Sequence, residues 1–487
     1  MADGQARAGD RFDPAPTAVV IGAGSGGLTV AVGLSRFGKR VRLVDRGRVG
    51  GDCTNVGCIP SKALLHASAE AAGAAAPRTG AEILAHVRAR RDQLWHHETE
   101  EFGATDGIDL QFGDARIVTP NRVEVTEPDG TVDVIETEHI VIATGSRPRE
   151  ITIEGLRGHR LLTNESLFEL DEPPSHLAIV GAGPIGVEMA TAFVRLGTRV
   201  TLLDAADRVL PAGLPEASAL VAKALSDSGV DVRPGRIATA YDEAGGRLTL
   251  GTVSGAGADA DGGVGEAIDG VDRVLVAIGR VPNTDGLGLE SLGVELGRGG
   301  QIVVDGKGRS SVDGIWAVGD ASDRGGTTHA ANAWGRRIIK AIIAPPAPAG
   351  PEPILPAVTF ASPEAASIGV QPVEVPSDVR RVVVDLSRSD RAFTDEATDG
   401  VVIVDVRRFS GRVLGATIVG PRAGELISIF SLAMKNGIRF PKWYGVVWPY
   451  PAYSDVLGRA VDEFMLEHLR NLHRDFPRWL VGRLRRS

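Results

Sequence analysis

Two segments of the chain repeat the same order of apolar and polar positions. Each has a short apolar run, a glycine-rich turn, an amphipathic stretch and a second apolar run that ends at an acid. In the first segment, Ala18 to Ile21 precedes Gly22, a helical pattern extends from Gly26 to about Phe37, and Val41 to Asp45 follows. Short apolar runs predict buried strands, and the helical spacing of apolar residues between the two runs predicts a helix. The segment therefore predicts one strand–helix–strand unit.

The second segment lies in the middle of the chain. Leu177 to Val180 leads into Gly181, a helical pattern extends to about Leu196, and Arg199 to Leu203 ends at Asp204. In both segments the closing acid comes 23 positions after the first glycine of a GxGxxG pattern. This arrangement is typical of units that bind dinucleotides. One such pattern is a weak signal, but two with the same spacing predict two dinucleotide sites.

Each glycine of the pattern has its own task. The first permits a tight turn, the second lets the backbone approach a pyrophosphate, and the third allows close packing of helix on strand. The helix N-terminus offers unpaired N–H groups and partial positive charge to the phosphates. The closing carboxylate can accept hydrogen bonds from a ribose. The residues concerned are Gly22, Gly24, Gly27 and Asp45 in the first unit and Gly181, Gly183, Gly186 and Asp204 in the second.

Composition narrows the class of protein. The 487 residues are enough for about three domains, and the formal net charge of −9 argues against a nucleic-acid partner. The N-terminus lacks the apolar core of a secretion signal, so we expect a disordered tail at residues 1–15 and a cytoplasmic protein. The uncharged run from Pro16 to Ser35 is long enough for a membrane span, but its glycines favour the nucleotide turn.

Three further segments have distinctive compositions. Gly251 to Gly270 is rich in Gly, Ala and Asp and predicts a surface insertion, and Pro345 to Pro353 predicts a linker. The basic stretch from Glu467 to Ser487 predicts a solvated helical tail, with contact to an anionic surface as the alternative.

The chain has two cysteines, Cys53 and Cys58, within the segment GGDCTNVGCIPSKALLH. A disulfide between such close neighbours could not staple the fold, so the pair indicates chemistry. Pro60 predicts that a helix starts near Cys58, and a thiolate at a helix N-terminus has a lowered pKa that favours a redox role. A zinc site would need more ligands. Two inert buried thiols are the alternative.

This cysteine segment, together with the two glycine patterns, resembles the flavin-dependent pyridine nucleotide–disulfide oxidoreductases, which include lipoamide dehydrogenase, glutathione reductase and mercuric reductase. The similarity extends from about Thr17 to the region of Phe464. It implies an α/β fold with two Rossmann-like dinucleotide-binding domains and a C-terminal α+β dimerisation domain. The implied boundaries are 16–150 and 280–345 for the FAD-binding domain, 151–279 for the NAD(P)-binding domain and 346–487 for the dimerisation domain.

The resemblance also implies the cofactors. FAD would occupy the first glycine turn, and the nicotinamide nucleotide would occupy the second. Because an acid repels a 2′-phosphate, Asp204 favours NADH over NADPH. The implied cofactor-binding residues are Gly22, Gly24, Ser25, Gly26, Gly27, Asp45, Arg46, Gly51, Asp52, Lys62, Ala115, Thr144, Gly145, Ser146, Gly181, Gly183, Ile185, Gly186, Asp204, Gly279, Arg280, Gly319, Asp320 and Ala321.

The implied electron path runs from NAD(P)H to the flavin, then to the Cys53–Cys58 disulfide and on to an external acceptor. Cys58 would face the flavin as the charge-transfer thiolate, and Cys53 would be the interchange thiol that meets the acceptor. Lys62 and Glu188 match an ion pair beside the flavin. In relatives the C-terminal segment completes the partner subunit's site, so the resemblance implies a homodimer.

The C-terminal motif departs from the family pattern. Thiol–disulfide members carry His-Pro-x-x-x-Glu, whereas in VWPYPAYSD Tyr450 takes the histidine position and Asp455 the glutamate position. A tyrosine with a pKa of about 10 is a poor base near neutral pH. Tyr450 is therefore interpreted as a ligand or hydrogen-bond donor to the acceptor, with a packed aromatic as the alternative. Tyrosine here is similar to mercuric reductases, although their C-terminal cysteine pair is absent.

The sequence leaves the acceptor open between a disulfide, a soft metal ion such as Hg(II), and a quinone. Dihydrolipoamide dehydrogenase itself is one alternative, and a flavin-bound redox sensor or binding protein is another. We also expect Trp443 and Trp448 to pack at the domain surface. His329 is interpreted either as a structural histidine or as a contact to the flavin.

Overall fold

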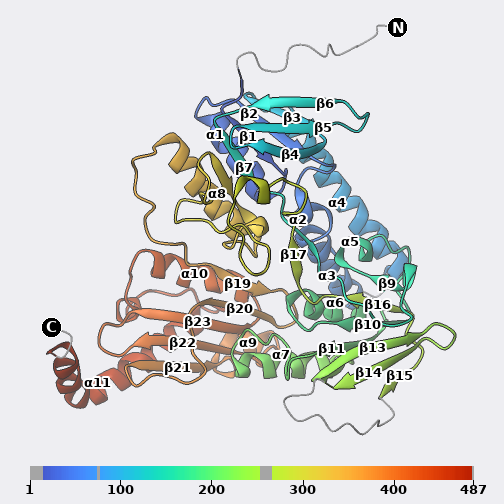
Figure 1. Ribbon diagram of the computed structural model, residues 1–487. Coiled ribbons are helices and arrows are strands. Elements are labelled where there is room, and N and C mark those ends of the chain that lie inside the picture. Colours follow the sequence, from blue (N-terminus) through green and yellow to red (C-terminus); the bar gives the residue numbers. More distant parts are fainter. Residues whose placement is uncertain (1–14, 74–76, 253–265, 485–487) are drawn as a thin grey trace.

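The computed structural model describes residues 15–73, 77–252 and 266–484. Within these residues, three five-stranded sheets form the framework (Figure 1). The predicted tail at residues 1–15 lies outside the described residues except for Ala15. Most of the predicted insertion from Gly251 to Gly270 also lies outside them.

The first sheet is parallel, in the order β18 (Ile315–Ala317), β7 (His139–Ile142), β1 (Ala18–Ile21), β2 (Val41–Asp45) and β3 (Ile108–Phe112). Successive side chains of a strand point to opposite faces. Ala18 and Val20 accordingly pack with α1 (Ser25–Arg36) and α8 (Thr328–Ile343). Val19 and Ile21 pack on the other face, against the antiparallel strands β4 (Asp114–Thr119), β5 (Arg122–Thr126) and β6 (Val132–Glu136).

The second sheet repeats this design, in the order β12 (Asp231–Pro234), β11 (Arg199–Asp204), β10 (His176–Val180), β16 (Arg273–Val276) and β9 (Leu161–Leu162). Leu177 and Ile179 pack with α6 (Pro184–Arg195) and α7 (Pro215–Asp227). Ala178 and Val180 face β13 (Arg236–Asp242), β14 (Arg247–Thr252) and β15 (Ala267–Ile268). The helices α3 (Cys58–Ala72) and α4 (Gly80–Gly103) join the α6 side of this core.

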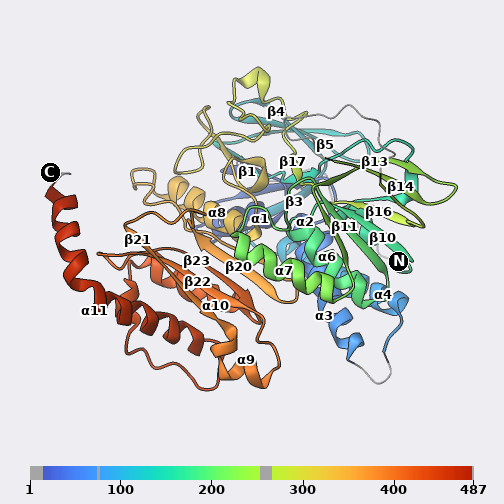
Figure 2. The ribbon, with the colours of Figure 1, turned by 90° about the horizontal axis from the view of Figure 1, so that it is seen from below.

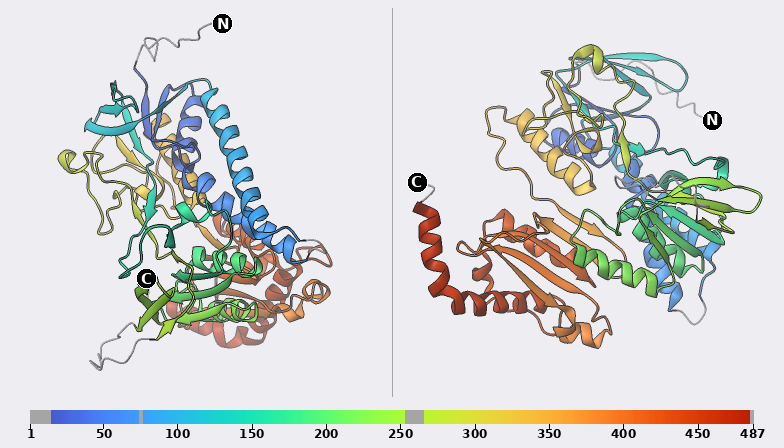
Figure 3. Two further views of the ribbon diagram at one scale, coloured as in Figure 1. Left: turned by 90° about the vertical axis from the view of Figure 1, so that its right-hand side faces the viewer. Right: turned by 60° about the horizontal axis from the view of Figure 1, so that its bottom comes forward.

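The third sheet is antiparallel, in the order β19 (Pro356–Thr359), β20 (Glu364–Gly369), β23 (Val413–Gly420), β22 (Val401–Arg407) and β21 (Val379–Asp385). Its core includes α10 (Ala423–Lys435) and the first turns of α11 (Asp455–Leu484). The prediction of a helix in the basic stretch is confirmed as far as Leu484, because this stretch is part of α11. The far end of α11 projects away from the sheet (Figures 2 and 3), and whether it is solvated or contacts an anionic surface stays a prediction.

The expectation of surface tryptophans is wrong for Trp443. That side chain is 4% exposed and packs against Phe430 and Phe440 in the core of the third sheet, because the turn Phe440–Trp443 folds back onto α10 and α11. Trp448 is partly buried against it, with 6.4 Å between the ring centroids.

Shorter elements complete the framework. They are α2 (Gly51–Asn55), α5 (Asn164–Leu167), α9 (Asp390–Thr394) and the antiparallel pair β8 (Ser146–Pro148) and β17 (Arg280–Pro282). No helix among the described residues is long and apolar enough to cross a membrane.

Candidate active site

A cavity of about 1320 Å³ lies where the carboxyl ends of β1, β2 and β7 meet the cysteine segment. We call it the main cavity. Its walls come from the N-termini of α1 and α8, from α2, α3 and β17, and from Phe360 after β19. Its volume exceeds the roughly 300–1000 Å³ typical of small-ligand pockets. Parallel sheets place ligands at this edge.

The first glycine turn forms one end of the main cavity. Gly22 has a φ of +105°, and a Cβ there would collide with the carbonyl oxygen of Ala143. A Cβ on Gly27 would collide with the carbonyl oxygen of Gly22. Gly24 caps α1 in an extended conformation without any side-chain cap, so N–H groups of the first turn are left for a ligand.

Asp45 closes this unit at the end of β2. One carboxylate oxygen accepts from Ala23 N at 2.7 Å, and the other accepts from Gly47 N at 2.9 Å. These bonds fix the carboxylate beside the glycine turn while leaving further lone pairs on its oxygens. The Asp45 carboxylate can therefore accept hydrogen bonds from a ribose, as the sequence predicts.

The second unit reproduces the same local geometry. Gly181 has a φ of +111°, and a Cβ on Gly186 would collide with the carbonyl oxygen of Gly181. Asp204 accepts hydrogen bonds from the backbone N–H groups of Ala182 and Ala206. Of this turn, Pro184 and Ile185 line the main cavity. The second nucleotide turn thus lies next to the main cavity.

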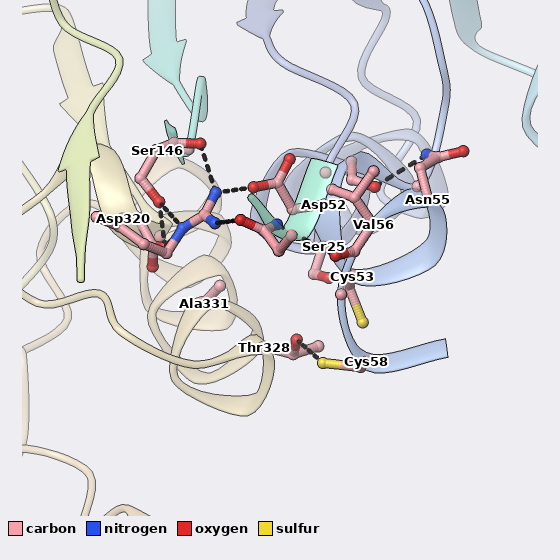
Figure 4. A pocket seen from close by; sticks show the side chains of 18 of the residues that line it. Ser25, Asp52, Cys53, Asn55, Val56, Cys58, Ser146, Asp320, Thr328 and Ala331 are labelled. Carbon is pink, nitrogen blue, oxygen red and sulfur yellow. Dashed lines mark hydrogen bonds and ion pairs between the residues drawn. The ribbon is translucent and has the colours of Figure 1, made fainter. Parts of the chain in front are cut away.

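The two cysteines lie on consecutive helices and line the main cavity (Figure 4). Cys53 is part of α2, and Cys58 is the first residue of α3, after Gly57. Both thiols are free, and Cys58 Sγ lies 3.7 Å from Thr328 Oγ1. The sequence-predicted placement of Cys58 at a helix N-terminus is confirmed.

The two thiols differ in acidity. A hydrogen bond from Cys53, helped by Thr328 and the charge of Lys62, lowers the pKa of Cys58 to about 6. The hydrogen bond to Cys58, together with burial, raises the pKa of Cys53 well above its usual range. The pair therefore holds one thiolate and one proton near neutral pH, with the proton on Cys53.

Lys62 and Glu188 form the predicted ion pair. Lys62 Nζ lies 2.8 Å from Glu188 Oε2, and Glu188 is 5% exposed. The other oxygen, Glu188 Oε1, accepts from Phe360 N at 2.9 Å, and the Lys62 ammonium lies 4.7 Å from the centroid of the Phe360 ring. The pair is thus fixed by α3, α6 and the end of β19 together.

Arg280 is the centre of a polar cluster that lines the main cavity. It donates to Ser146 Oγ at 2.7 Å and to Asn164 Oδ1 at 3.2 Å, and it forms an ion pair with Asp52. Ser146 in turn donates to Asp320 Oδ2 at 2.7 Å (Figure 4). Burial lowers the pKa of Arg280, and its acidic neighbours keep the guanidinium paired.

The main cavity brings together most, but not all, of the predicted site residues. Those that line it are Gly22, Gly24, Ser25, Gly26, Asp45, Arg46, Gly51, Asp52, Cys53, Cys58, Lys62, Ala115, Thr144, Gly145, Ser146, Ile185, Glu188, Arg280, Gly319 and Asp320. Those outside its lining are Gly27, Gly181, Gly183, Gly186, Asp204, Gly279, Ala321, Tyr450 and Asp455. Ala321 is fully buried in the core beneath the first sheet.

Tyr450 lies apart from the cysteines of its own chain. It is 72% exposed, and its hydroxyl donates to Asp390 Oδ2 at 3.0 Å. That bond raises the pKa of Tyr450 above its usual value. Asp455 pairs with Arg459 at 3.4 Å and forms no hydrogen bond to Tyr450. A role for Tyr450 in the partner subunit's site stays a prediction.

Sequence reasoning missed several residues of the site, including three that contact Arg280, Cys58 or Glu188. Asn164, Thr328 and Phe360 all line the main cavity and contact the groups described above. The one signal in the sequence near Asn164 is Thr163, the N-cap of α5. An N-cap predicts where a helix starts, but it does not predict that Asn164 contacts Arg280. His329 lines the main cavity, and its Nε2 lies 2.7 Å from the carbonyl oxygen of Pro356. This contact agrees with a structural histidine, and a contact to the flavin stays a prediction.

The fold and the site define an oxidoreductase with two dinucleotide-binding units and a redox-active pair of cysteines. Residues 16–335 match the pyridine nucleotide-disulphide oxidoreductase family, and residues 355–461 match the dimerisation domain of that family. The chain belongs to this family, so it is an FAD-dependent enzyme that uses NAD(P)H. The dimerisation domain supports a homodimer.

Similar proteins fall into two groups. Dihydrolipoyl dehydrogenase from Geobacillus stearothermophilus is 32% identical over 461 residues, which cover 91% of this chain and 95% of the relative. A Cu(II) complex of RclA, an HOCl-induced flavoprotein disulfide reductase from Escherichia coli, superimposes with a TM-score of 0.81 at 26% identity and covers 93% of this chain and 99% of RclA. The crystal structure of LpdA from Mycobacterium tuberculosis superimposes with a TM-score of 0.81 at 27% identity, and the match covers 92% of this chain and 99% of LpdA.

The residues present fit the FAD of this family. The uncapped start of α1, the glycines that leave room for a backbone-bound phosphate, and Asp45 suit the adenosine diphosphate part. The main cavity continues from this turn to the cysteine pair, so it has space for the flavin ring of FAD beside Cys58.

Proposed function

We propose that this enzyme passes electrons from NADH to an external metal ion, such as Cu(II) or Hg(II), through the Cys53–Cys58 pair. The observation that carries the proposal is the pair itself, with an acidic Cys58 thiol at the start of α3 in the main cavity. Bound FAD would supply the two-electron exchange between the pyridine nucleotide and this pair.

The protein's own groups account for the protons. When the Cys53–Cys58 disulfide accepts two electrons, its S–S bond breaks and one proton is taken up by Cys53, whose pKa is raised. Cys58 remains a thiolate beside Lys62, and Glu188 holds that ammonium in place. Lys62 and Glu188 are therefore expected to set the acidity of Cys58 rather than to react.

Tyr450 favours a metal ion as the acceptor. Its hydroxyl is already donated to Asp390, and its raised pKa prevents it from taking a proton from a substrate thiol near neutral pH. Two Cu(II) ions oxidise the Cys53 thiol and the Cys58 thiolate to the disulfide, which gives two Cu(I) and releases one proton. This reaction needs no base on the substrate side. The solved Cu(II) complex of RclA supports copper as a candidate.

Dihydrolipoyl dehydrogenase activity is the second candidate, because the curated relatives at 30–33% identity carry that name. It requires a group that takes a proton from the substrate dithiol and that returns the proton when NADH reduces lipoamide. The absence of a histidine at position 450 argues against efficient turnover of that substrate.

An acceptor comparison tests the proposal. NADH oxidation by the purified holoenzyme is followed with Cu(II), Hg(II), a quinone, glutathione disulfide and lipoamide, each at saturation. We expect turnover with a metal ion that disappears in Cys53→Ser, and little turnover with lipoamide unless Tyr450→His is introduced. Lipoamide turnover equal to metal turnover in the unchanged enzyme would contradict the proposal. Stable capture of a protein partner without turnover would favour a sensor.

Three finer points stay predictions. Asp204 favours NADH, because a 2′-phosphate would lie against its carboxylate. Tyr450 is expected to complete the partner subunit's site in the homodimer. The enzyme is expected in the cytoplasm.

A further inference from the structure

The loop between the two cysteines is tied at both ends to residues far away in the sequence. Asp52, directly before Cys53, forms an ion pair with Arg280. The carbonyl oxygen of Val56, two positions before Cys58, accepts a hydrogen bond from Asn164 Nδ2 at 3.1 Å. Figure 4 shows Asp52 and Val56 on the wall of the main cavity that carries the cysteines.

The two ties meet at one guanidinium. Arg280 Nη1 donates to Asn164 Oδ1 at 3.2 Å, so the residue that holds Val56 also contacts the residue that holds Asp52. Arg280 is itself held by two bonds of 2.7 Å to Ser146, one to the hydroxyl and one to the carbonyl oxygen. The planar fork of an arginine gives such contacts a fixed direction.

We propose that Asp52 and Asn164 are positioning residues that set the reduction potential of the Cys53–Cys58 couple by holding this loop through Arg280. The inference rests on the proposed redox role of the pair. A disulfide forms only within a narrow range of Cα separations and dihedral angles. A restrained loop keeps the second thiol at high effective concentration, so it stabilises the disulfide and makes the potential more negative.

The test is a thiol–disulfide equilibrium measured on the holoenzyme. The Cys53–Cys58 disulfide reacts with two glutathione thiols to give the protein dithiol and one glutathione disulfide, with two electrons transferred to the protein. Samples equilibrated in glutathione buffers at fixed pH are alkylated and weighed by mass spectrometry. Bound FAD is quantified for each variant by absorbance.

Asn164→Ala removes both the bond to Val56 and the bond to Arg280. We expect it to favour the dithiol about tenfold, a shift of about 30 mV to less negative potential. Asn164→Asp keeps an acceptor for Arg280 and loses the donor to Val56, so its shift should be smaller. Asp52→Ala should act in the same direction as Asn164→Ala. Asp227→Asn, which breaks an exposed ion pair on α7, is the control and should leave the equilibrium unchanged.

An equilibrium constant within twofold of the unchanged enzyme in both alanine variants, with normal FAD content, would overturn the proposal. If Asp52→Ala loses FAD, the two Asn164 variants decide alone, because a purely structural defect would not rank them in the expected order. The experiment uses no NADH and measures an equilibrium with glutathione rather than turnover with an acceptor. Failure of the acceptor comparison would therefore refute the proposed function and leave this positioning role standing.

Discussion

The hydrogen bond between the two thiols can be removed without loss of Cys58. Replacing Cys53 with Ser or Ala leaves Cys58 as the only thiol of the chain. Ser keeps a hydroxyl that can donate to Cys58, whereas Ala does not. Because this bond is the largest cause of the lowered pKa, we expect a Cys58 pKa of about 6 in Cys53→Ser and a higher value, toward the ordinary 9.0, in Cys53→Ala.

The size of the effect follows from the thiolate fraction. At pH 7 a thiol of pKa 6 is about 90% thiolate, and one of pKa 9 is about 1%. Thr328 and Lys62 still lower the pKa after the bond is lost, so the full difference is an upper limit. Loss of half the shift would leave about a quarter of the Cys58 population as thiolate, a fourfold decrease.

Alkylation by iodoacetamide between pH 4.5 and 10 measures this difference. The thiolate is the reactive form, so each rate rises with pH and levels off above the pKa. The inflection is compared, rather than the absolute rate, because a less basic thiolate is also less nucleophilic. The same inflection in both variants, or one near pH 9 in Cys53→Ser, would refute the role assigned to the hydrogen bond.

Three further changes test other parts of the site. Gly27→Ala puts a Cβ against the carbonyl of Gly22 and should abolish FAD binding, measured as the ratio of flavin to protein absorbance, whereas Gly103→Ala, with open space at its Cβ, should not. Glu188→Leu removes the partner of Lys62 and of the Phe360 N–H group, so it should lower the free energy of unfolding in urea by about 1–3 kcal/mol. An unchanged free energy of unfolding would contradict the pairing. Asp204→Ala should shift the ratio of kcat/KM for NADPH over NADH upward about tenfold, or about 1.4 kcal/mol, and an unchanged ratio would remove Asp204 from nucleotide choice.

The strand–helix–strand units could be predicted because each depends on local sequence. A buried parallel strand must be apolar on both faces, and a tight turn onto a helix requires glycine, so Ala18 to Gly27 carries its structure within ten residues. The strands at Val41–Asp45 and Arg199–Asp204 coincide with their predicted limits. The start of α3 at Cys58 follows from Pro60 by the same local reasoning.

The polar cluster could not be predicted because it depends on long-range contacts. Asn164 reaches Val56 across 108 positions of sequence, and Arg280 reaches Asp52 across 228. A single asparagine after a helix cap has no local mark that distinguishes this contact from an ordinary helix start. The burial of Trp443 could not be predicted for a related reason, because it depends on α10 and α11 packing around one short turn.

The two glycine turns were equivalent in sequence, and the fold separates them. Gly22, Gly24 and Asp45 are part of the lining of the main cavity, whereas Gly181, Gly183 and Asp204 are not. The second unit reaches the cavity through α6, whose first residues, Pro184 and Ile185, are exposed. A cofactor that stays bound needs a site that covers most of its surface, and a nucleotide that leaves after every turnover needs an open one. The first turn therefore suits a resident FAD, and the second suits an NAD(P)H that exchanges. The two copies of the motif do not by themselves decide which cofactor each turn binds, because that choice depends on how the rest of the fold packs around each turn.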